Sequence, residues 1–280
     1  MPELPEVETI KGDLAKLIVG KEILDISTDV PKQVQPSLKK VKKVIIGLQI
    51  KQVNRRAKIL QIILSNNWAL IVHLKLTGRL LFRKKNDPPD KWVHVIINLG
   101  SLVKGKKKEF QLRFSDSRKF GWIKLVNNQE LKKINQKFGP EPLADLDQKT
   151  FKKILSSTRR VVKGLLLDQK KIAGIGNIYA CDALFLAQID PRRPANQLSG
   201  EEEKSLFQAI EKVLKAGIKY RGASDQYYLD ALGHKGSYQD HFLVYGRTGK
   251  KCFGCSGKVK RIVVGGRGTF YCPVCQRLKS

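Results

Sequence analysis

Long apolar runs are missing from this sequence. The longest stretch without a charged side chain, residues 59–74, includes Ser65, Asn66 and Asn67, and it is too short and too polar to span a bilayer. The first six residues contain neither a basic segment nor an apolar one, so we expect no signal peptide. These absences argue against a membrane or exported protein and favour a location in the cytoplasm.

Signatures of several enzyme classes are missing too. The sequence has no G-x-S-x-G motif and no Walker loop, so nothing in it supports a serine hydrolase or a P-loop nucleotide hydrolase. Its four histidines, His73, His94, His234 and His241, share no metal-ligand spacing. We therefore interpret each histidine, from pattern alone, as a packing or hydrogen-bonding residue.

Acidic residues are scarce. The chain has 25 Asp and Glu against 54 Lys and Arg, which gives a net charge of +29. Such an excess repels itself unless a polyanion neutralises it, so nucleic acid is the first partner to consider, and a merely solvated basic surface is the alternative. Hydrophobic residues make up 41% of the 280, which excludes a wholly disordered chain, and this length suits about two domains.

Hydrophobic periodicity divides the chain into a β-rich part and a helical part. A helix is predicted over residues 5–18, and strands are predicted at 22–28, 41–53, 59–64, 69–74, 92–99, 110–114 and 121–126. One helix followed by many antiparallel strands predicts a sandwich or barrel. After a Pro/Gly linker at residues 138–143, helices are predicted at 149–157, 163–168, 177–187 and 201–220, and two strands at 259–264 and 268–271.

Four of the five cysteines form two C-x-x-C pairs. The spacing is Cys252-x2-Cys255-x16-Cys272-x2-Cys275, and the 16 intervening residues are enough for a β-hairpin that brings the pairs together. Four thiolates without an open position predict one structural Zn²⁺ in a reducing compartment. Rubredoxin-type iron and reduced cysteines without a metal are the alternatives. Cys181 is interpreted as a small core residue.

Two loops carry residues suited to nucleic acid. The turn Gly174-Ile175-Gly176-Asn177 precedes a helix and follows Arg159-Arg160 and Lys163, which favours phosphate binding over a plain helix-joining turn. The second loop spans residues 116–121. In it, Phe120 can wedge into a base stack while Arg118 bonds the opposite base, and the alternative is a Phe120 packed in the core.

The run Pro2-Glu3-Leu4-Pro5-Glu6-Val7-Glu8-Thr9 resembles the bacterial formamidopyrimidine-DNA glycosylase family of repair enzymes. The resemblance extends over nearly the whole chain, through residues 55–58, 73–78, 118–121, 138–143, 166–169, 174–180, 244–247 and 267–273. It implies a DNA glycosylase and AP lyase that excises oxidised purines, 8-oxoguanine and formamidopyrimidines, by a Schiff base followed by β,δ-elimination. The related endonuclease VIII type, which prefers oxidised pyrimidines, and a non-catalytic DNA-binding protein are the alternatives.

The resemblance also implies a role for individual residues. Pro2, once Met1 is removed, would attack C1′ of a flipped-out nucleotide, with Glu3 as general acid and Glu6 handling water and protons. Lys58 would assist β-elimination and Arg267 δ-elimination. The implied DNA contacts are Leu76, which stands at the family's usual methionine position, and His94, Arg118, Phe120, Arg159, Lys163 and Asn177. In Cys181-Asp182 the acidic role falls to Asp182 alone, and residues 221–240 resemble the lesion-capping loop in outline.

The implied architecture is an α+β multidomain fold. Residues 1–137 would form an N-terminal catalytic β-sandwich with flanking helices, residues 138–243 a helical helix–two-turns–helix domain that binds DNA, and residues 244–280 a zinc-ribbon β-hairpin. We expect a monomer that binds damaged double-stranded DNA, holds one Zn²⁺ and associates with the nucleoid.

Overall fold

The computed structural model describes residues 1–103 and 106–278, and the chain forms two compact units. Met1–Gln136 and Tyr220–Ser237 make up the first, here called the N-terminal unit, and Lys137–Lys219 and Tyr238–Ser280 the second, the C-terminal unit. The segment 220–237 thus groups with the first unit, whereas the expected three-part division assigns it to the helical domain. Among the described residues, no helix combines the length and hydropathy needed to cross a membrane.

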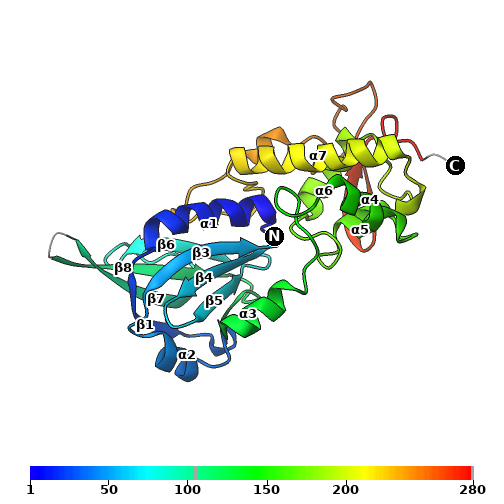
Figure 1. Ribbon diagram of the computed structural model, residues 1–280. Coiled ribbons are helices and arrows are strands. Elements are labelled where there is room, and N and C mark those ends of the chain that lie inside the picture. The colour runs from blue at the N-terminus through cyan, green and yellow to red at the C-terminus, as the bar shows by residue number, and fades with distance from the viewer. Residues whose placement is uncertain (104–105, 279–280) are drawn as a thin grey trace. The chain divides into compact units, whose positions relative to one another are not determined.

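The N-terminal unit contains two β-sheets (Figure 1). One has the order β1-β7-β8-β6, and the other has the order β2-β9-β5-β4-β3. Their strands are β1 (Glu22–Thr28), β2 (Val34–Gln35), β3 (Ile50–Arg56), β4 (Ile59–Leu64), β5 (Trp68–His73), β6 (Arg79–Lys84), β7 (Val93–Val103), β8 (Lys106–Ser115) and β9 (Trp122–Asn127). Buried residues of both sheets form one hydrophobic core, as the predicted sandwich requires.

Helix α1 (Leu4–Ile18) covers this core (Figure 1). Its apolar residues Val7, Ile10, Leu14 and Ile18 recur at helical spacing, and none of them exposes any surface. Pro5 stands in the first turn, where a missing N–H costs nothing. The predicted first helix is confirmed, and it places residues 2–6 at the start of a rigid element.

The strand predicted over residues 41–53 is wrong in its first half. Residues Leu38–Ile45 form the helix α2, and β3 begins only at Ile50. The Ser37 side chain caps α2 by accepting a hydrogen bond from the Lys40 N–H at 3.3 Å, and Val41 and Ile45, four residues apart, are the buried positions. The β-branched side chains suggested a strand, but the burial follows the helical period. Strand β6 and helix α3 (Asn128–Asn135) were not predicted.

In its described residues, the C-terminal unit consists of helices, loops and one β-hairpin. Its helices are α4 (Gln148–Ser156), α5 (Val162–Leu166), α6 (Asn177–Leu186) and α7 (Gly200–Lys219), and its hairpin pairs β10 (Lys260–Val264) with β11 (Arg267–Tyr271). Gly265 and Gly266 both have positive φ, as the two-residue turns that join antiparallel strands require. The C-terminal unit also contains the short 3₁₀ turns η2 (Ala195–Gln197) and η3 (Tyr238–His241), and η1 (Pro31–Gln33) lies in the N-terminal unit. The α+β prediction, with a helical region and a cysteine-bearing hairpin, is confirmed.

Candidate functional site

Two buried carboxyl groups meet at the start of α1. Glu3 is the N-cap residue and Glu6 the third helical residue, and the two form a reciprocal capping box in which the Glu3 N–H donates to Glu6 Oε2 at 2.8 Å. Glu3 is 3% and Glu6 1% exposed, and Pro2 beside them is buried as well. The chain therefore fixes Pro2 and two carboxyl groups by local backbone geometry. In the full sequence, the Pro2 nitrogen is part of the Met1–Pro2 amide, and removal of Met1 converts it to a secondary amine.

The segment 220–237 completes the surroundings of Glu6. The Ala223 N–H donates to Glu6 Oε1 at 2.8 Å, and the Tyr228 hydroxyl donates to the Glu6 backbone oxygen at 3.4 Å. A Cβ atom on Gly222 would lie 2.8 Å from the Glu6 side chain, so this approach needs glycine. Sequence reasoning missed this contact because more than 200 residues separate its two sides and no motif links them.

Lys58 lies in the tight turn between β3 and β4. Ala57 before it has a φ of 53°, and the Lys58 side chain is only 7% exposed. On the neighbouring strand β5, burial and, to a smaller extent, the positive charges of Lys75 and Lys58 together lower the pKa of His73 to about 4. His73 is thus neutral at pH 7, and its Nδ1 accepts the Lys75 N–H at 3.0 Å. The arrangement keeps the Lys58 ammonium in a poorly hydrated position beside an uncharged ring.

A single buried carboxylate organises the loop after β8. Asp116 is 0% exposed and accepts hydrogen bonds from the Gly121 N–H at 2.7 Å, the Arg118 N–H at 3.2 Å and the Thr77 hydroxyl. In the loop that it holds, Phe120 is 52% exposed and the Arg118 guanidinium lies 5.0 Å from the Phe120 ring centroid. The alternative that Phe120 packs in the sandwich core is therefore wrong. Its insertion into DNA stays a prediction.

Two further expected DNA contacts, Leu76 and His94, are less exposed than Phe120. Leu76 is half-buried in the turn between β5 and β6. The His94 ring lies with Nδ1 3.0 Å from an Asp29 carboxylate oxygen, and its side chain is 10% exposed. The pattern-based interpretation of His94 as a hydrogen-bonding residue agrees with this contact, and its contact with DNA stays a prediction.

Truncation of Phe120 separates a DNA-inserting role from a structural one. Because this ring is exposed, we expect Phe120→Ala to change the melting temperature by no more than about 2 °C. Excision from a lesion duplex should fall at least about tenfold, because the ring would no longer replace the stacking lost on base extrusion. Phe114→Ala, which empties a fully buried site, should instead destabilise the fold by about 3–5 kcal/mol. A Phe120→Ala protein that is destabilised but excises normally per folded molecule would refute the inserting role.

Lys163, an expected phosphate contact, has partners within the protein, and its contact with phosphate stays a prediction. Its side chain is 0% exposed, and its Nζ donates to Thr269 Oγ1 at 2.6 Å and to the Gly268 backbone oxygen at 3.2 Å. Asn177 donates from Nδ2 to the same Gly268 oxygen at 2.9 Å. In this structure both side chains thus hold the hairpin strand β11. A buried ammonium needs such internal partners, and a run of sequence cannot reveal them.

Two other expected contacts of the C-terminal unit are open to solvent. Arg159 is exposed in the loop before α5, and Arg267 is exposed at the first position of β11, next to the residue that Lys163 and Asn177 hold. The backbone at Gly268 is held by two hydrogen bonds, and the long Arg267 side chain extends into solvent from the preceding residue. Such a group can reach an anionic oxygen without disturbing the fold.

A buried acid joins α6 to the segment before the hairpin. Asp182 is 0% exposed and accepts the backbone N–H groups of Leu243, Val244 and Tyr245 at 3.0–3.2 Å. Burial raises the pKa of Asp182 to about 6 although these hydrogen bonds oppose it. Cys181 is buried beside it, and burial raises the pKa of this thiol to about 11, which agrees with its interpretation as a core residue.

The four remaining cysteines form a metal site. The sulfur atoms of Cys252, Cys255, Cys272 and Cys275 all lie within 4.8 Å of one another, with 3.8 Å between Cys252 and Cys275 and 3.5 Å between Cys255 and Cys272. Sulfur ligands about 2.3 Å from a tetrahedral zinc ion lie roughly 3.8 Å apart, so the geometry fits one Zn²⁺. The predicted structural zinc is confirmed in its ligand set.

Comparison with known proteins assigns the family. Family models match at residues 1–123 (formamidopyrimidine-DNA glycosylase N-terminal domain), 138–228 (the H2TH domain of the same enzymes) and 249–278 (a zinc finger found in FPG and IleRS). A formamidopyrimidine-DNA glycosylase of Herpetosiphon aurantiacus is 44% identical over 99% of this chain and 100% of its own length.

Solved structures agree with the sequence relatives. The Lactococcus lactis enzyme in complex with DNA containing an abasic site has a TM-score of 0.90 and 36% identity, over 99% of this chain and 100% of that one. A mutant of the same enzyme, bound to DNA containing Fapy-dG, matches with the same TM-score, identity and coverage. The chain described here therefore belongs to the formamidopyrimidine-DNA glycosylase family.

Proposed function

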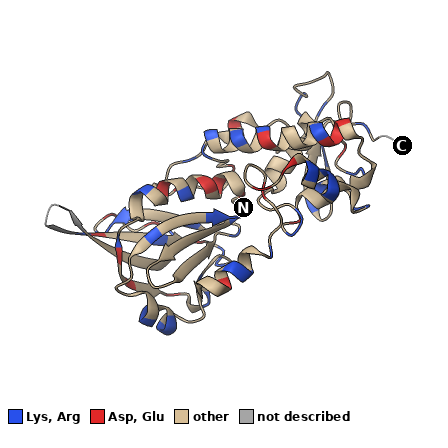
Figure 2. Cartoon of the chain, viewed as in Figure 1, with Lys and Arg blue, Asp and Glu red and all other residues tan. Residues whose placement is uncertain are grey.

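We propose that this glycosylase is bifunctional: it excises oxidised purines from double-stranded DNA as a monomer and then cleaves the strand as an AP lyase. The observation that carries the proposal is the buried cluster at the start of α1, where Pro2 adjoins the Glu3–Glu6 capping box. A purely hydrolytic or purely DNA-binding protein needs no amine at this position. The net charge of +29, with Lys and Arg on both units (Figure 2), supports a polyanionic substrate.

The covalent step uses the Pro2 amine. Its nitrogen forms a bond to C1′ of the extruded nucleotide while the bond from C1′ to the damaged base breaks, and the base leaves with a proton. Glu3 protonates the sugar ring oxygen, which opens the ring and leaves a C1′ iminium ion on Pro2. Glu6, held by the N–H groups of Glu3 and Ala223, would relay protons with water at this point.

Strand cleavage follows from the acidity that the iminium confers on C2′. Loss of a C2′ proton expels the 3′ phosphate in β-elimination, and a second elimination expels the 5′ phosphate. We assign Lys58 to the first departure and Arg267 to the second, because a cation beside each leaving phosphate stabilises its charge. The anchoring of Gly268 by Lys163 and Asn177 supports the assignment of Arg267, since it fixes the backbone from which this side chain extends.

Duplex substrates with defined lesions test this function. Duplexes that contain 8-oxoguanine or a formamidopyrimidine should be cut to leave phosphates on both sides of a one-nucleotide gap, and a dihydrothymine duplex should be cut much more slowly. Faster cleavage of the dihydrothymine duplex would favour the endonuclease VIII type. Tight binding to lesion duplexes without any base release would favour the non-catalytic alternative and refute the proposal.

A further inference from the structure

Trp92 lies just before β7 with its indole in solvent. Trp92 is 51% exposed, and among the described residues its ring takes part in no aromatic stacking and no cation contact. The other two tryptophans, Trp68 and Trp122, are half-buried on neighbouring strands of the second sheet. A single exposed apolar side chain is ordinary in a folded protein, so exposure alone does not indicate that Trp92 binds a ligand.

The Trp92 backbone is in an unfavourable conformation. Its φ is 57°, in the left-handed region that bulky L residues rarely occupy. The Trp92 carbonyl accepts the N–H of Asp116, the residue that follows β8, at 2.9 Å. Backbone strain of this kind persists only where the surroundings fix it, and it concentrates at functional positions.

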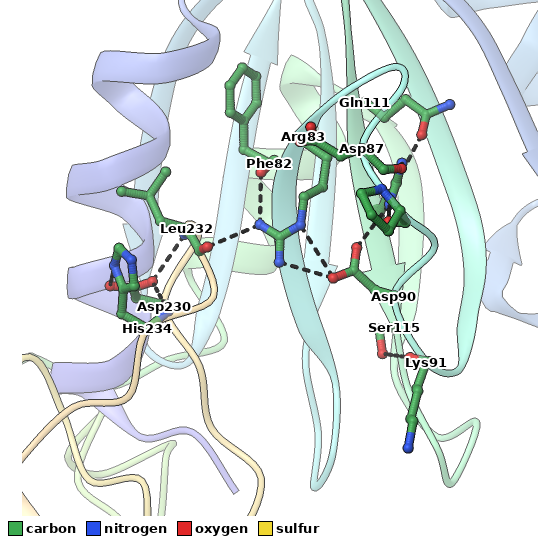
Figure 3. Close-up of polar contacts among 12 residues, drawn as sticks. Phe82, Arg83, Asp87, Asp90, Lys91, Gln111, Ser115, Asp230, Leu232 and His234 are labelled. Atoms are coloured by element: carbon green, nitrogen blue, oxygen red, sulfur yellow. Dashed lines mark hydrogen bonds and ion pairs between the residues drawn. The ribbon is translucent and has the colours of Figure 1, made fainter.

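A polar network fixes the segment that leads to Trp92. Asp90 accepts from Arg83 Nη2 at 2.9 Å and from Arg113 Nη1 at 3.1 Å, so that it joins two strands of the first sheet. Figure 3 shows Arg83 between Asp90 and the Leu232 carbonyl, to which it donates at 3.0 Å. Next to Trp92, the Lys91 carbonyl accepts the Ser115 hydroxyl at 2.6 Å (Figure 3). The backbone from which the indole extends is therefore held in place by its neighbours.

The same support holds the loop with Phe120. Asp116, which donates to the backbone of Trp92, is also the buried carboxylate that organises Arg118 and Phe120. Asp116 thus holds the backbone beside two exposed aromatic residues, Trp92 (51% exposed) and Phe120 (52% exposed). Lys91 and Lys119 beside them are exposed as well, which gives this part of the N-terminal unit the combination of aromatic faces and cations that binds nucleic acid.

We propose that Trp92 is a second aromatic DNA contact, whose indole packs on a sugar or base face of the duplex that Arg118 and Phe120 engage. This inference rests on the proposed function. The backbone that carries Trp92 is already held by the Asp116 N–H, so binding has to order only the indole side chain itself. The base faces of an intact duplex are covered by neighbouring base pairs, whereas its sugars are accessible and carry no sequence information. Packing of Trp92 on a sugar would therefore strengthen binding to damaged and undamaged duplexes alike.

Affinity measurements on three variants test the proposal. Trp92→Ala should weaken binding to an abasic-site duplex about tenfold, the range typical of one lost stacking contact, whereas Trp92→Phe should keep most of the affinity. Ile46→Ala removes a similarly exposed apolar side chain (47%) of the same unit and should leave binding unchanged. Equal affinity of Trp92→Ala and the original protein would overturn the proposal.

Tryptophan fluorescence tests the same contact by a measurement that does not require a destabilising substitution at Trp92. With Trp68→Phe and Trp122→Phe in place, Trp92 is the sole tryptophan, and saturation with the duplex should quench its emission. If that double variant fails to fold, the difference between the original protein and Trp92→Phe gives the same signal. Unchanged Trp92 emission in a protein that binds and cuts the duplex would contradict this inference alone. Failure of the unaltered protein to bind any lesion duplex would refute the proposed function as well.

Discussion

Glu3→Gln should lower excision of 8-oxoguanine by about 10²–10⁴-fold, the contribution typical of one general acid. Glutamine cannot give a proton to the sugar ring oxygen, yet its carbonyl oxygen can still cap α1, and the backbone N–H at position 3 still reaches Glu6. We therefore expect the melting temperature to stay nearly the same. Cleavage at a preformed abasic site should fall much less, because no base has to leave.

A matched control shows whether the loss of excision is due to the position of Glu3 or only to the loss of one negative charge. Glu22→Gln removes one negative charge from an exposed position at the start of β1, and it should leave excision unchanged. The assay is single-turnover excision on intact lesion duplexes and on abasic duplexes, with melting temperatures from the same preparations. Glu3→Gln with full excision activity would exclude Glu3 as the acid.

Cys252→Ser or Cys275→Ser should abolish stoichiometric zinc binding and DNA affinity together. A small four-thiolate hairpin depends on its metal for folding, so loss of one ligand should release β10 and β11 and with them the position of Arg267. The N-terminal unit has its own hydrophobic core and should stay folded. The loss of DNA affinity should exceed the loss caused by removing any single side chain that contacts a phosphate.

The fifth cysteine supplies the control for the metal prediction. Cys181→Ala alters a buried thiol outside the sulfur cluster, so zinc content should stay at one per chain. Metal analysis of natively purified protein and binding to an abasic-site duplex are the two measurements. Active protein without zinc would contradict the assignment of a structural metal site.

Local sequence patterns predicted the features that neighbouring residues determine. The first helix and the cysteine cluster follow from spacing within a short segment, and both are present. The helix α2 was misread because Val41, Val44 and Ile45 favour strands, whereas the Ser37 cap and packing against the core favour a helix.

Contacts between distant segments lay beyond sequence reasoning. The Ala223 N–H on Glu6 and the ammonium of Lys163 on Thr269 each join residues more than 100 positions apart. Lys163 is an example: its place after two arginines suggested a phosphate contact, and no sequence pattern indicated that it is buried against β11. The exposure of Phe120 likewise depends on Asp116, whose burial no periodicity indicates.

Borohydride trapping tests the central claim, that Pro2 is the nucleophile. With Met1 removed, the protein and an 8-oxoguanine duplex should give a reduced, covalent protein–DNA adduct. Peptide mapping should place the adduct on the N-terminal proline, and protein that retains Met1 should give none, because its Pro2 nitrogen is an amide. An adduct found only on a lysine such as Lys58, or full strand cleavage without any trapped adduct, would contradict the account.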